Sequence, residues 1–249
     1  MIEGKNAVLE ALKANRTIDK IFVADGNTDR VLGEIVRTAK ERRIVVTFVD
    51  RRDLDKKSET HAHQGVIAMA TETEYVEIAD ILKIAEEHSE PPLIIVCDEI
   101  SDPHNLGAIL RTAECAGAHG VIIPKRRGAG LSSAIVEKSS AGAASYVPVA
   151  RVANLNAAIK ELKAANVWVC GADAGSDKTM WDIDFTVPVA LVIGSEGTGL
   201  GRLVSENCDF IASIPMKGQI SSLNASNAAA ALMYEVLRQR TNGRKTLRG

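Results

Sequence analysis

Three clusters of polar and glycine residues in this sequence have the residue types needed for ligand binding and catalysis. The first contains Asp102, Asn105, Arg111 and Glu114 and follows an apolar run that ends at Cys97. Asn105 could cap the helix that follows, and Arg111 and Glu114 would be neighbours on one helical face. Taken alone, this cluster is equally consistent with a capped surface helix that carries an internal ion pair.

The second cluster is the glycine-rich segment 194–201, which directly follows an apolar run. It matches neither common nucleotide-binding loop: the dinucleotide fingerprint would need glycine at Arg202, and the phosphate loop would need lysine at Leu200. The sequence therefore supports neither NAD nor ATP chemistry. Glycines after a strand still let a ligand approach the backbone at the carboxyl end of an open sheet. The alternative is a tight turn without a ligand.

The third cluster begins with Ile214-Pro215-Met216 and Gly218 and continues through the polar segment 221–227. Here a strand ends in an irregular loop, and a segment rich in Ser and Asn opens an Ala-rich helix. The N-terminus of such a helix can donate hydrogen bonds to an anion or a carbonyl. A well-capped helix without a ligand is the alternative.

Composition and charge narrow the class of protein. The 249 residues are 46% hydrophobic, which excludes intrinsic disorder, and the formal net charge of −2 excludes a histone-like basic protein. The four cysteines are far apart and His61 and His63 have no third ligand nearby, so no metal site is predicted. No apolar run approaches the roughly 18 residues that span a bilayer. Because the first residues also lack the apolar stretch of a signal peptide, we expect a cytoplasmic protein.

The elements that position these clusters follow an alternating α/β pattern. The sequence predicts strands at 18–24, 44–49, 65–70, 93–96, 120–123, 167–170, 187–193 and 210–214, and helices at 30–41, 78–84, 105–116, 155–162 and 225–238. Strands that are apolar on both faces and separated by helices indicate a parallel sheet covered on both sides. A polar stretch at 72–76 is predicted to be a linker between a first domain, 1–71, and a second, 77–249.

In this order, the three clusters resemble the three motifs of the SpoU branch of the SPOUT methyltransferases, also called the TrmH family. The matching residues are Asp102-Pro103-x-Asn105-Leu106-Gly107-x-x-x-Arg111, then Ile193-Gly194-Ser195-Glu196-Gly197-x-Gly199-Leu200, then Ile214-Pro215-Met216-x-Gly218-x-x-x-Ser222-Leu223-Asn224-x-Ser226. The segments Glu3-Gly4-x-Asn6-Ala7-Val8 and His63-Gln64-Gly65-Val66 resemble the opening and the closing strand of the substrate-binding domain in the ribosomal-RNA guanosine branch.

This resemblance implies an RNA ribose 2′-O-methyltransferase that uses S-adenosylmethionine. It also implies a catalytic SPOUT α/β domain with a parallel sheet and a deep trefoil knot, a small N-terminal α/β domain similar to ribosomal protein L30e that binds RNA, and a homodimer with each cofactor pocket near the interface. The expected substrate is a guanosine of large-subunit rRNA. A tRNA methyltransferase of the same family and a non-catalytic RNA-binding ribosome-assembly factor remain open.

The resemblance also assigns roles to individual residues. It places the cofactor at Gly194, Glu196, Gly199, Ile214, Met216 and Leu223, and catalysis at Arg111 with Asn105, Glu196, Ser222 and Asn224 as orienting groups. The family's arginine has been described as the general base. Because a guanidinium is effectively always protonated, we expect Arg111 to bind a phosphate and to stabilise the developing alkoxide.

Contacts to RNA need positive charge. The candidates are Arg42, Arg43, Arg51, Arg52, Lys56 and Lys57 in the first domain, Lys125, Arg126 and Arg127 after a core strand, and Arg238, Arg240, Arg244, Lys245 and Arg248 in the tail. Each run is also consistent with a solvated surface. Because only 4% of residues are aromatic, we expect recognition of RNA shape and phosphates rather than base stacking.

Overall fold

A computed structural model describes residues 1–26, 29–70, 74–131 and 134–246, with side chains as far as residue 241. The chain forms two compact units: Met1–Glu74 with Gly130–Tyr146, and Tyr75–Ala129 with Val147–Gly249. The predicted linker, 72–76, lies at 72–73 outside the described residues, and the predicted domain boundary stays a prediction.

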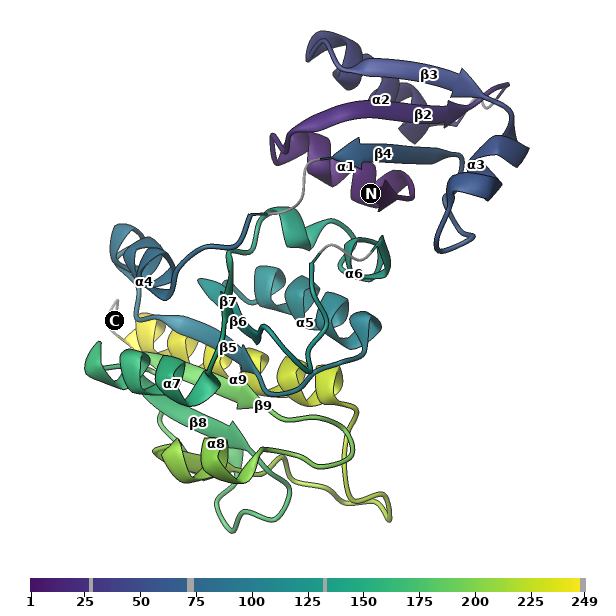
Figure 1. The fold of residues 1–249 in the computed structure, drawn as a ribbon. Helices are drawn as coiled ribbons and strands as arrows, with labels where there is room; N and C mark the ends of the chain where they lie inside the picture. The colour runs from purple at the N-terminus through teal and green to yellow at the C-terminus, as the bar shows by residue number, and fades with distance from the viewer. Residues whose placement is uncertain (27–28, 71–73, 132–133, 247–249) are drawn as a thin grey trace. The chain divides into compact units, whose positions relative to one another are not determined.

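The first unit is a four-stranded sheet with helices packed on it (Figure 1). The strand order is β1-β4-β2-β3, and only β2 and β3 run parallel. Its strands are β1 (Ile2–Glu3), β2 (Ile18–Ala24), β3 (Val45–Val49) and β4 (Val66–Ala70), and its helices are α1 (Lys5–Lys13), α2 (Arg30–Glu41) and α3 (Arg51–Lys57). Apolar side chains of α1 and α2 pack on one face of this sheet and form its main core.

A distant segment of the chain completes the first unit. It contains α6 (Ala134–Ser139) and the short helix η1 (Ala143–Ser145), and it joins α1 through side-chain contacts. The hydroxyl of Tyr146 donates to Glu10 Oε2 at 2.8 Å, and Arg16 forms an ion pair with the buried Glu137. The chain therefore passes between the two units three times.

The second unit is built on a six-stranded sheet in which every pairing is parallel. The strand order is β10-β8-β9-β5-β6-β7. The strands are β5 (Leu93–Cys97), β6 (Gly120–Pro124), β7 (Val149–Val152), β8 (Trp168–Ala172), β9 (Val189–Ile193) and β10 (Phe210–Ala212). Every residue of β5 and β9 is buried, as expected for central strands covered on both faces.

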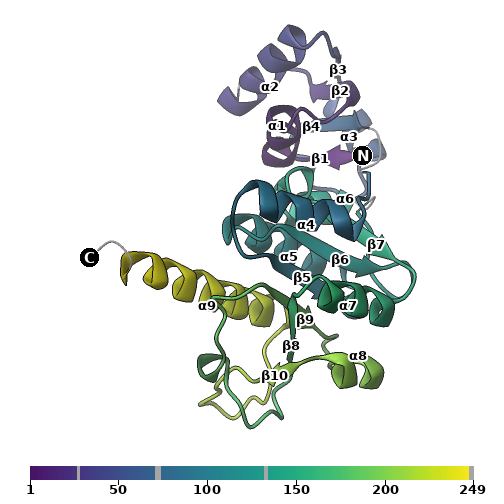
Figure 2. The same cartoon turned by 90° about the vertical axis from the view of Figure 1, so that its left-hand side faces the viewer.

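Helices cover both faces of this sheet (Figure 2). Apolar residues of α4 (Ile78–Glu87), α7 (Leu155–Ala164) and α8 (Arg202–Asn207) pack on one face. The other face carries α5 (Pro103–Cys115) and α9 (Ala225–Thr246), which contact each other. The approach of α4 is close: a Cβ at Gly120 would lie 2.6 Å from the Cδ1 atom of Ile81.

The structure confirms the α/β class, the parallel sheet and the small additional N-terminal domain. The trefoil knot and the likeness to ribosomal protein L30e stay predictions. The sequence analysis missed several short elements, namely β1, α1, α3, α6, β7 and α8. The last predicted strand is shorter than expected, because its pairing with β8 ends at Ala212.

Candidate functional site

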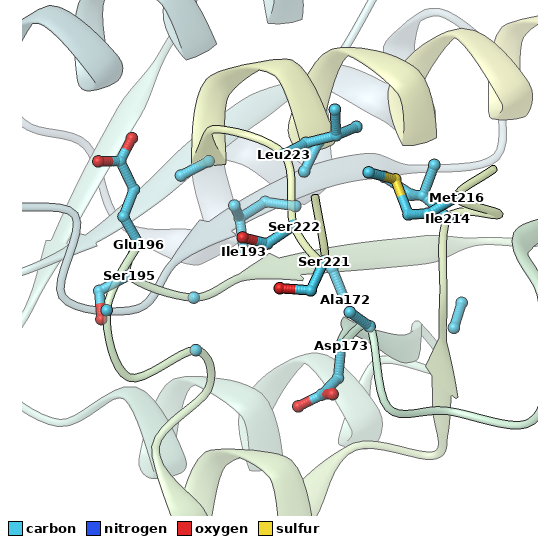
Figure 3. A pocket seen from close by; sticks show the side chains of 17 residues that line it. Ala172, Asp173, Ile193, Ser195, Glu196, Ile214, Met216, Ser221, Ser222 and Leu223 are labelled. Carbon is cyan, nitrogen blue, oxygen red and sulfur yellow. The ribbon is translucent and has the colours of Figure 1, made fainter. Parts of the chain in front are cut away.

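A pocket of about 350 Å³ lies at the carboxyl ends of the central strands of the second unit (Figure 3). Its lining comes from segments that follow β8, β9 and β10 and from the start of α9. The lining includes all six residues predicted to bind the cofactor, Gly194, Glu196, Gly199, Ile214, Met216 and Leu223, together with Ser222. Figure 3 shows Ile214, Met216 and Leu223 gathered on one side, with the carboxyl groups of Glu196 and Asp173 in separate places.

The glycine-rich loop folds tightly against itself. The backbone of Ser195 exchanges two hydrogen bonds with Gly199, at 3.1 and 3.0 Å, and Gly199 has a φ of +65° that favours glycine. A Cβ at Gly194 would lie 2.3 Å from the carbonyl carbon of Gly199. Gly194 therefore allows the two ends of the loop to touch, which presents main-chain groups to the pocket.

Side chains from all three predicted motifs meet beside this loop. Nδ2 of Asn105 donates to Oε1 of Glu196 at 2.9 Å, and Nδ2 of Asn224 donates to Oδ1 of Asn105 at 3.0 Å. Asn224 also donates to Glu196. Hydrogen bonds to a charged acceptor are the stronger kind, so this cluster fixes Glu196 and links α5, the glycine loop and the start of α9.

The two asparagines differ in how they sit on their helices. Asn224 caps α9: its Oδ1 accepts from the backbone N–H of Ser226 at 2.9 Å and of Asn227 at 3.3 Å. The expectation that Asn105 caps α5 is wrong. Asp102 is the cap, because its Oδ1 accepts from the N–H of His104. Asn105 is instead a buried residue in the first turn, and its amide is thus available to Glu196.

A buried carboxylate holds the far end of the glycine loop. Oδ2 of Asp98, which directly follows β5, accepts from the backbone N–H of Gly201 at 2.7 Å. Burial raises the pKa of Asp98, while this hydrogen bond acts to lower it and nearby Glu99 adds to the rise. Behind the loop, Gly171 leaves room for Leu200, since a Cβ there would lie 2.7 Å from Leu200 Cδ1. Asp98 was not among the predicted site residues.

Arg111 lies on the exposed side of α5. It is six positions after Asn105, so the two side chains leave the helix in directions about 120° apart. Among the described residues Arg111 has no hydrogen-bond or ion-pair partner, so the ion pair with Glu114 that belonged to the alternative interpretation of this cluster is not formed. Arg111 is not part of the pocket lining either.

Asp173 lines the pocket and was missed by the sequence analysis. It follows β8 in the same way that the predicted clusters follow their strands, and this position was the available signal. The pocket residues fit S-adenosylmethionine. Apolar side chains can cover an adenine, main-chain groups of the glycine loop can bond its polar edge, and the Asp173 carboxylate can accept from hydroxyl or ammonium groups.

The basic residues expected to contact RNA divide into two groups. Arg42 donates to the carbonyls of Leu12 and Arg16, and Arg240 donates to four carbonyls that include those of Pro91 and Pro92. Both guanidinium groups stabilise the fold. The four hydrogen bonds of Arg240 leave it little capacity for phosphates, whereas Arg42 uses only two of its five N–H donors. The exposed candidates are Arg43, Arg51, Arg52, Lys56, Lys57, Lys125, Arg126, Arg127 and Arg238, the last of which pairs with Glu235. Arg248 and the side chains of Arg244 and Lys245 lie outside the described part.

The described residues contain neither a candidate metal site nor a helix suited to span a membrane. Over residues 1–26, 29–70, 74–131 and 134–246, no three His, Cys, Asp or Glu side chains are grouped so that they could hold a metal ion. In the same part of the chain, no helix has both the length and the apolar character needed to cross a membrane. The expected cytoplasmic location stays a prediction.

Two family models match the chain. Residues 92–234 match the SpoU rRNA Methylase family, and residues 1–76 match the model for RNA 2′-O ribose methyltransferase substrate binding. The YacO protein of Bacillus subtilis, named as a TrmH family tRNA/rRNA methyltransferase, is 47% identical over 95% of this chain and 94% of its own length. The chain therefore belongs to the SpoU, or TrmH, family of S-adenosylmethionine-dependent RNA methyltransferases.

Solved structures agree with this assignment. The SpoU methyltransferase AviRb from Streptomyces viridochromogenes, in complex with AdoMet, is similar with a TM-score of 0.80 and 28% identity, over 96% of this chain and 89% of that one. The TrmH/SpoU tRNA modifying enzyme of A. aeolicus is similar with a TM-score of 0.56 and 27% identity, but over only 65% of this chain and 83% of its own.

Proposed function

We propose that this protein transfers the methyl group of S-adenosylmethionine to the ribose 2′-hydroxyl of a guanosine in large-subunit rRNA. The observation that carries the proposal is the contact of Asn105, Glu196 and Asn224 beside a pocket lined by the predicted cofactor residues. These side chains come from three separate motifs, and a protein without turnover would have no need to keep them joined there. The non-catalytic alternative is therefore the weaker one.

Methyl transfer requires the protein mainly to align the ribose hydroxyl with the methyl group and to stabilise the developing charge. When bound, S-adenosylmethionine supplies a methyl group already activated on a sulfonium. The residues of this chain must hold the ribose hydroxyl in line and stabilise the charge that develops on its oxygen. Arg111, an exposed guanidinium, is suited to bind the phosphate beside the target ribose and to stabilise that oxygen. The cluster around Glu196 keeps the loop in place.

Two observations favour rRNA over tRNA as the substrate. The matching family model is described as an rRNA methylase. The tRNA-modifying structure corresponds to only 65% of this chain, whereas this chain has a separate unit that matches a substrate-binding model over residues 1–76. A tRNA methyltransferase of the same family is the second candidate, because relatives such as YacO are named for both substrates.

We also propose that the active form is a homodimer. Large apolar side chains are exposed close to the pocket, in the segment from Met216 to Tyr234; Ile220 is 73% exposed and Tyr234 50%. A second copy of the chain would cover them. It would also offer a way for Arg111, which is not among the residues that line its own pocket, to contact the pocket of the partner. Light scattering should give the mass of two chains, and the mass of one chain would contradict the dimer.

The reaction can be tested with labelled S-adenosylmethionine and two protein-free substrates, large-subunit rRNA and total tRNA. We expect label in rRNA, at a ribose 2′-oxygen of guanosine as mapped by mass spectrometry. Arg111→Ala should abolish transfer yet bind S-adenosylmethionine with nearly unchanged affinity in calorimetry. Label in tRNA alone would show that tRNA, and not rRNA, is the substrate. Near-normal turnover by Arg111→Ala would contradict the role of this residue in the reaction.

A further inference from the structure

Among the described residues, one face of the sheet in the first unit is covered only at one end. Register places Lys20 beside Val45 and Met69 in one row across three strands, and Phe22 beside Thr47 and Ile67 in the next. Cross-strand neighbours point to the same side of a sheet. The alternate residues, Ile21 and Val23 among them, point to the opposite side, where α1 and α2 form the core.

The cover on this face comes from α3. Leu54 of α3 packs with Ala24 and Ile67, and Phe22 and Val49 lie against them. The row beyond Phe22 stays open: Val45 is 57% exposed and Met69 42%. We define the open sheet face as the set Lys20, Phe22, Val45, Thr47, Lys57 and Met69.

Two cationic side chains converge on the one aromatic ring of this face. The Nζ atom of Lys20 lies 4.8 Å from the centroid of Phe22, and that of Lys57 lies 5.1 Å from it. Neighbouring carboxylates are bound elsewhere: Asp53 pairs with Lys56 at 3.0 Å, and Asp55 contacts His63 at 2.9 Å. In the part of the chain that the structure describes, neither Lys20 nor Lys57 forms an ion pair, and both ammonium groups lie beside apolar surface.

Unpaired RNA is the partner that matches this combination. Its phosphates would pair with the ammonium groups, and its bases would contact Phe22 and the exposed apolar side chains of Val45 and Met69. Duplex RNA presents phosphates but keeps its base faces stacked inside, so it would leave the apolar side chains without a partner. The family model for substrate binding spans these strands.

We propose that the open sheet face binds an unpaired stretch of the RNA substrate. The inference rests on the proposed function, because that function makes RNA the substrate of this chain. The low aromatic content of the sequence led us to expect recognition of RNA shape and phosphates without base stacking. The proposal changes this expectation, because the ring of Phe22 lies at the centre of a basic, partly apolar face and would contact a base.

The test uses the full chain, a fluorescein-labelled 20-nucleotide oligouridylate and an A·U duplex of the same length, with binding followed by fluorescence anisotropy. Lys20→Gln/Lys57→Gln should weaken binding of the single strand about tenfold. It should also lower the slope of log affinity against log salt concentration by about 1.4, because each of the two lost phosphate contacts contributes roughly 0.7. Phe22→Leu, which keeps most of the buried volume, should weaken it at least about fivefold. The control Arg37→Gln/Lys40→Gln removes the same charge from exposed positions of α2 and should change binding less than about twofold.

Calorimetric binding of S-adenosylmethionine and the thermal melt should match the wild type in every variant, which shows that the fold is kept. Unchanged affinity in the Lys20/Lys57 variant, an equal loss in the control, or equal binding of the duplex would overturn the inference. If any of these three results is found while the wild-type protein still methylates RNA, the inference fails and the proposed function stands. If the variants lose binding as expected but the wild type methylates no RNA, the inference stands and the proposed function fails.

Discussion

Gly194→Ala is the substitution whose effect follows most directly from the geometry of the pocket. The added carbon would lie 2.3 Å from the carbonyl carbon of Gly199, 2.4 Å from its oxygen and 2.5 Å from the nitrogen of Leu200. Favourable contacts between such atoms are roughly 3.5–4.0 Å, so the shortfall is about 1 Å. Because all three atoms belong to the backbone, no side-chain rotation relieves the overlap, and the loop itself must move.

Two quantities should respond to this movement. Overpacking of this kind costs about 1–3 kcal/mol, and at roughly 2–4 °C per kcal/mol for a protein of this size the Tm should fall by several degrees. The displaced loop should also lose main-chain contacts to S-adenosylmethionine. One or two hydrogen bonds of about 0.5–1.5 kcal/mol each correspond to roughly a tenfold rise in Kd or more.

Gly197→Ala provides a matched control in the same loop. A Cβ at Gly197 would meet no atom within 4 Å among the described residues, and its backbone is not in the left-handed region. Its Tm should therefore stay near the wild-type value. The reasoning is refuted if Gly194→Ala binds S-adenosylmethionine like the wild type with an unchanged melt, or if both variants lower the Tm equally.

Substitutions at three further residues test the groups around the loop and in the first unit. Asn224→Ser keeps a capping oxygen for α9 but cannot reach Glu196, so methyl transfer should fall sharply with little change in Tm; Asn224→Ala should lose transfer and also about 1 kcal/mol of stability in thermal melts. Asp98→Ala removes the acceptor for Gly201 and should weaken cofactor binding about tenfold in calorimetry, whereas Asp98→Asn keeps an acceptor and should not. Burial acts to raise the pKa of Glu3, but hydrogen bonds from Thr60, Ser58 and two backbone N–H groups outweigh it and hold the pKa below 4.5. Glu3→Gln should therefore cost about 1.5–3 kcal/mol in urea melts at neutral pH, and this difference should shrink as pH falls below 4.5 through the folded-state pKa; a constant difference would contradict the assignment.

Much of the fold was predictable from local patterns. Continuous apolar runs such as 93–96 and 187–193 mark strands that are buried on both faces, and β5 and β9 are such strands. The long helices α2 and α9 also show clear patterns. The short helices α3 and α8 were missed because six or seven residues hold too few apolar positions to display a helical period.

The capping of α5 shows where a local rule failed. Asn105 has the residue type of a cap, but Pro103 is suited to the first helical position and sets the start of the helix earlier, so Asp102 becomes the cap. Asn105 then turns its amide inward. Asp102 followed by Pro103 was the signal for this start of the helix, but Asn105, the other candidate for the cap, is closer to the apolar residues of the helix.

The sequence by itself determined the α/β class and the two loops, 194–201 and 214–224, whose residues line the pocket, because each depends on residues that are near neighbours in the chain. Only the tertiary structure decided that Asn224 meets Asn105, that Asp98 holds Gly201, and that the segment Gly130–Tyr146 completes the first unit. The physical reason is the spatial strand order β8-β9-β5, which differs from the order in the chain. That order arises from packing both faces of the sheet at once, and a local pattern carries no information about which strand becomes the neighbour of another.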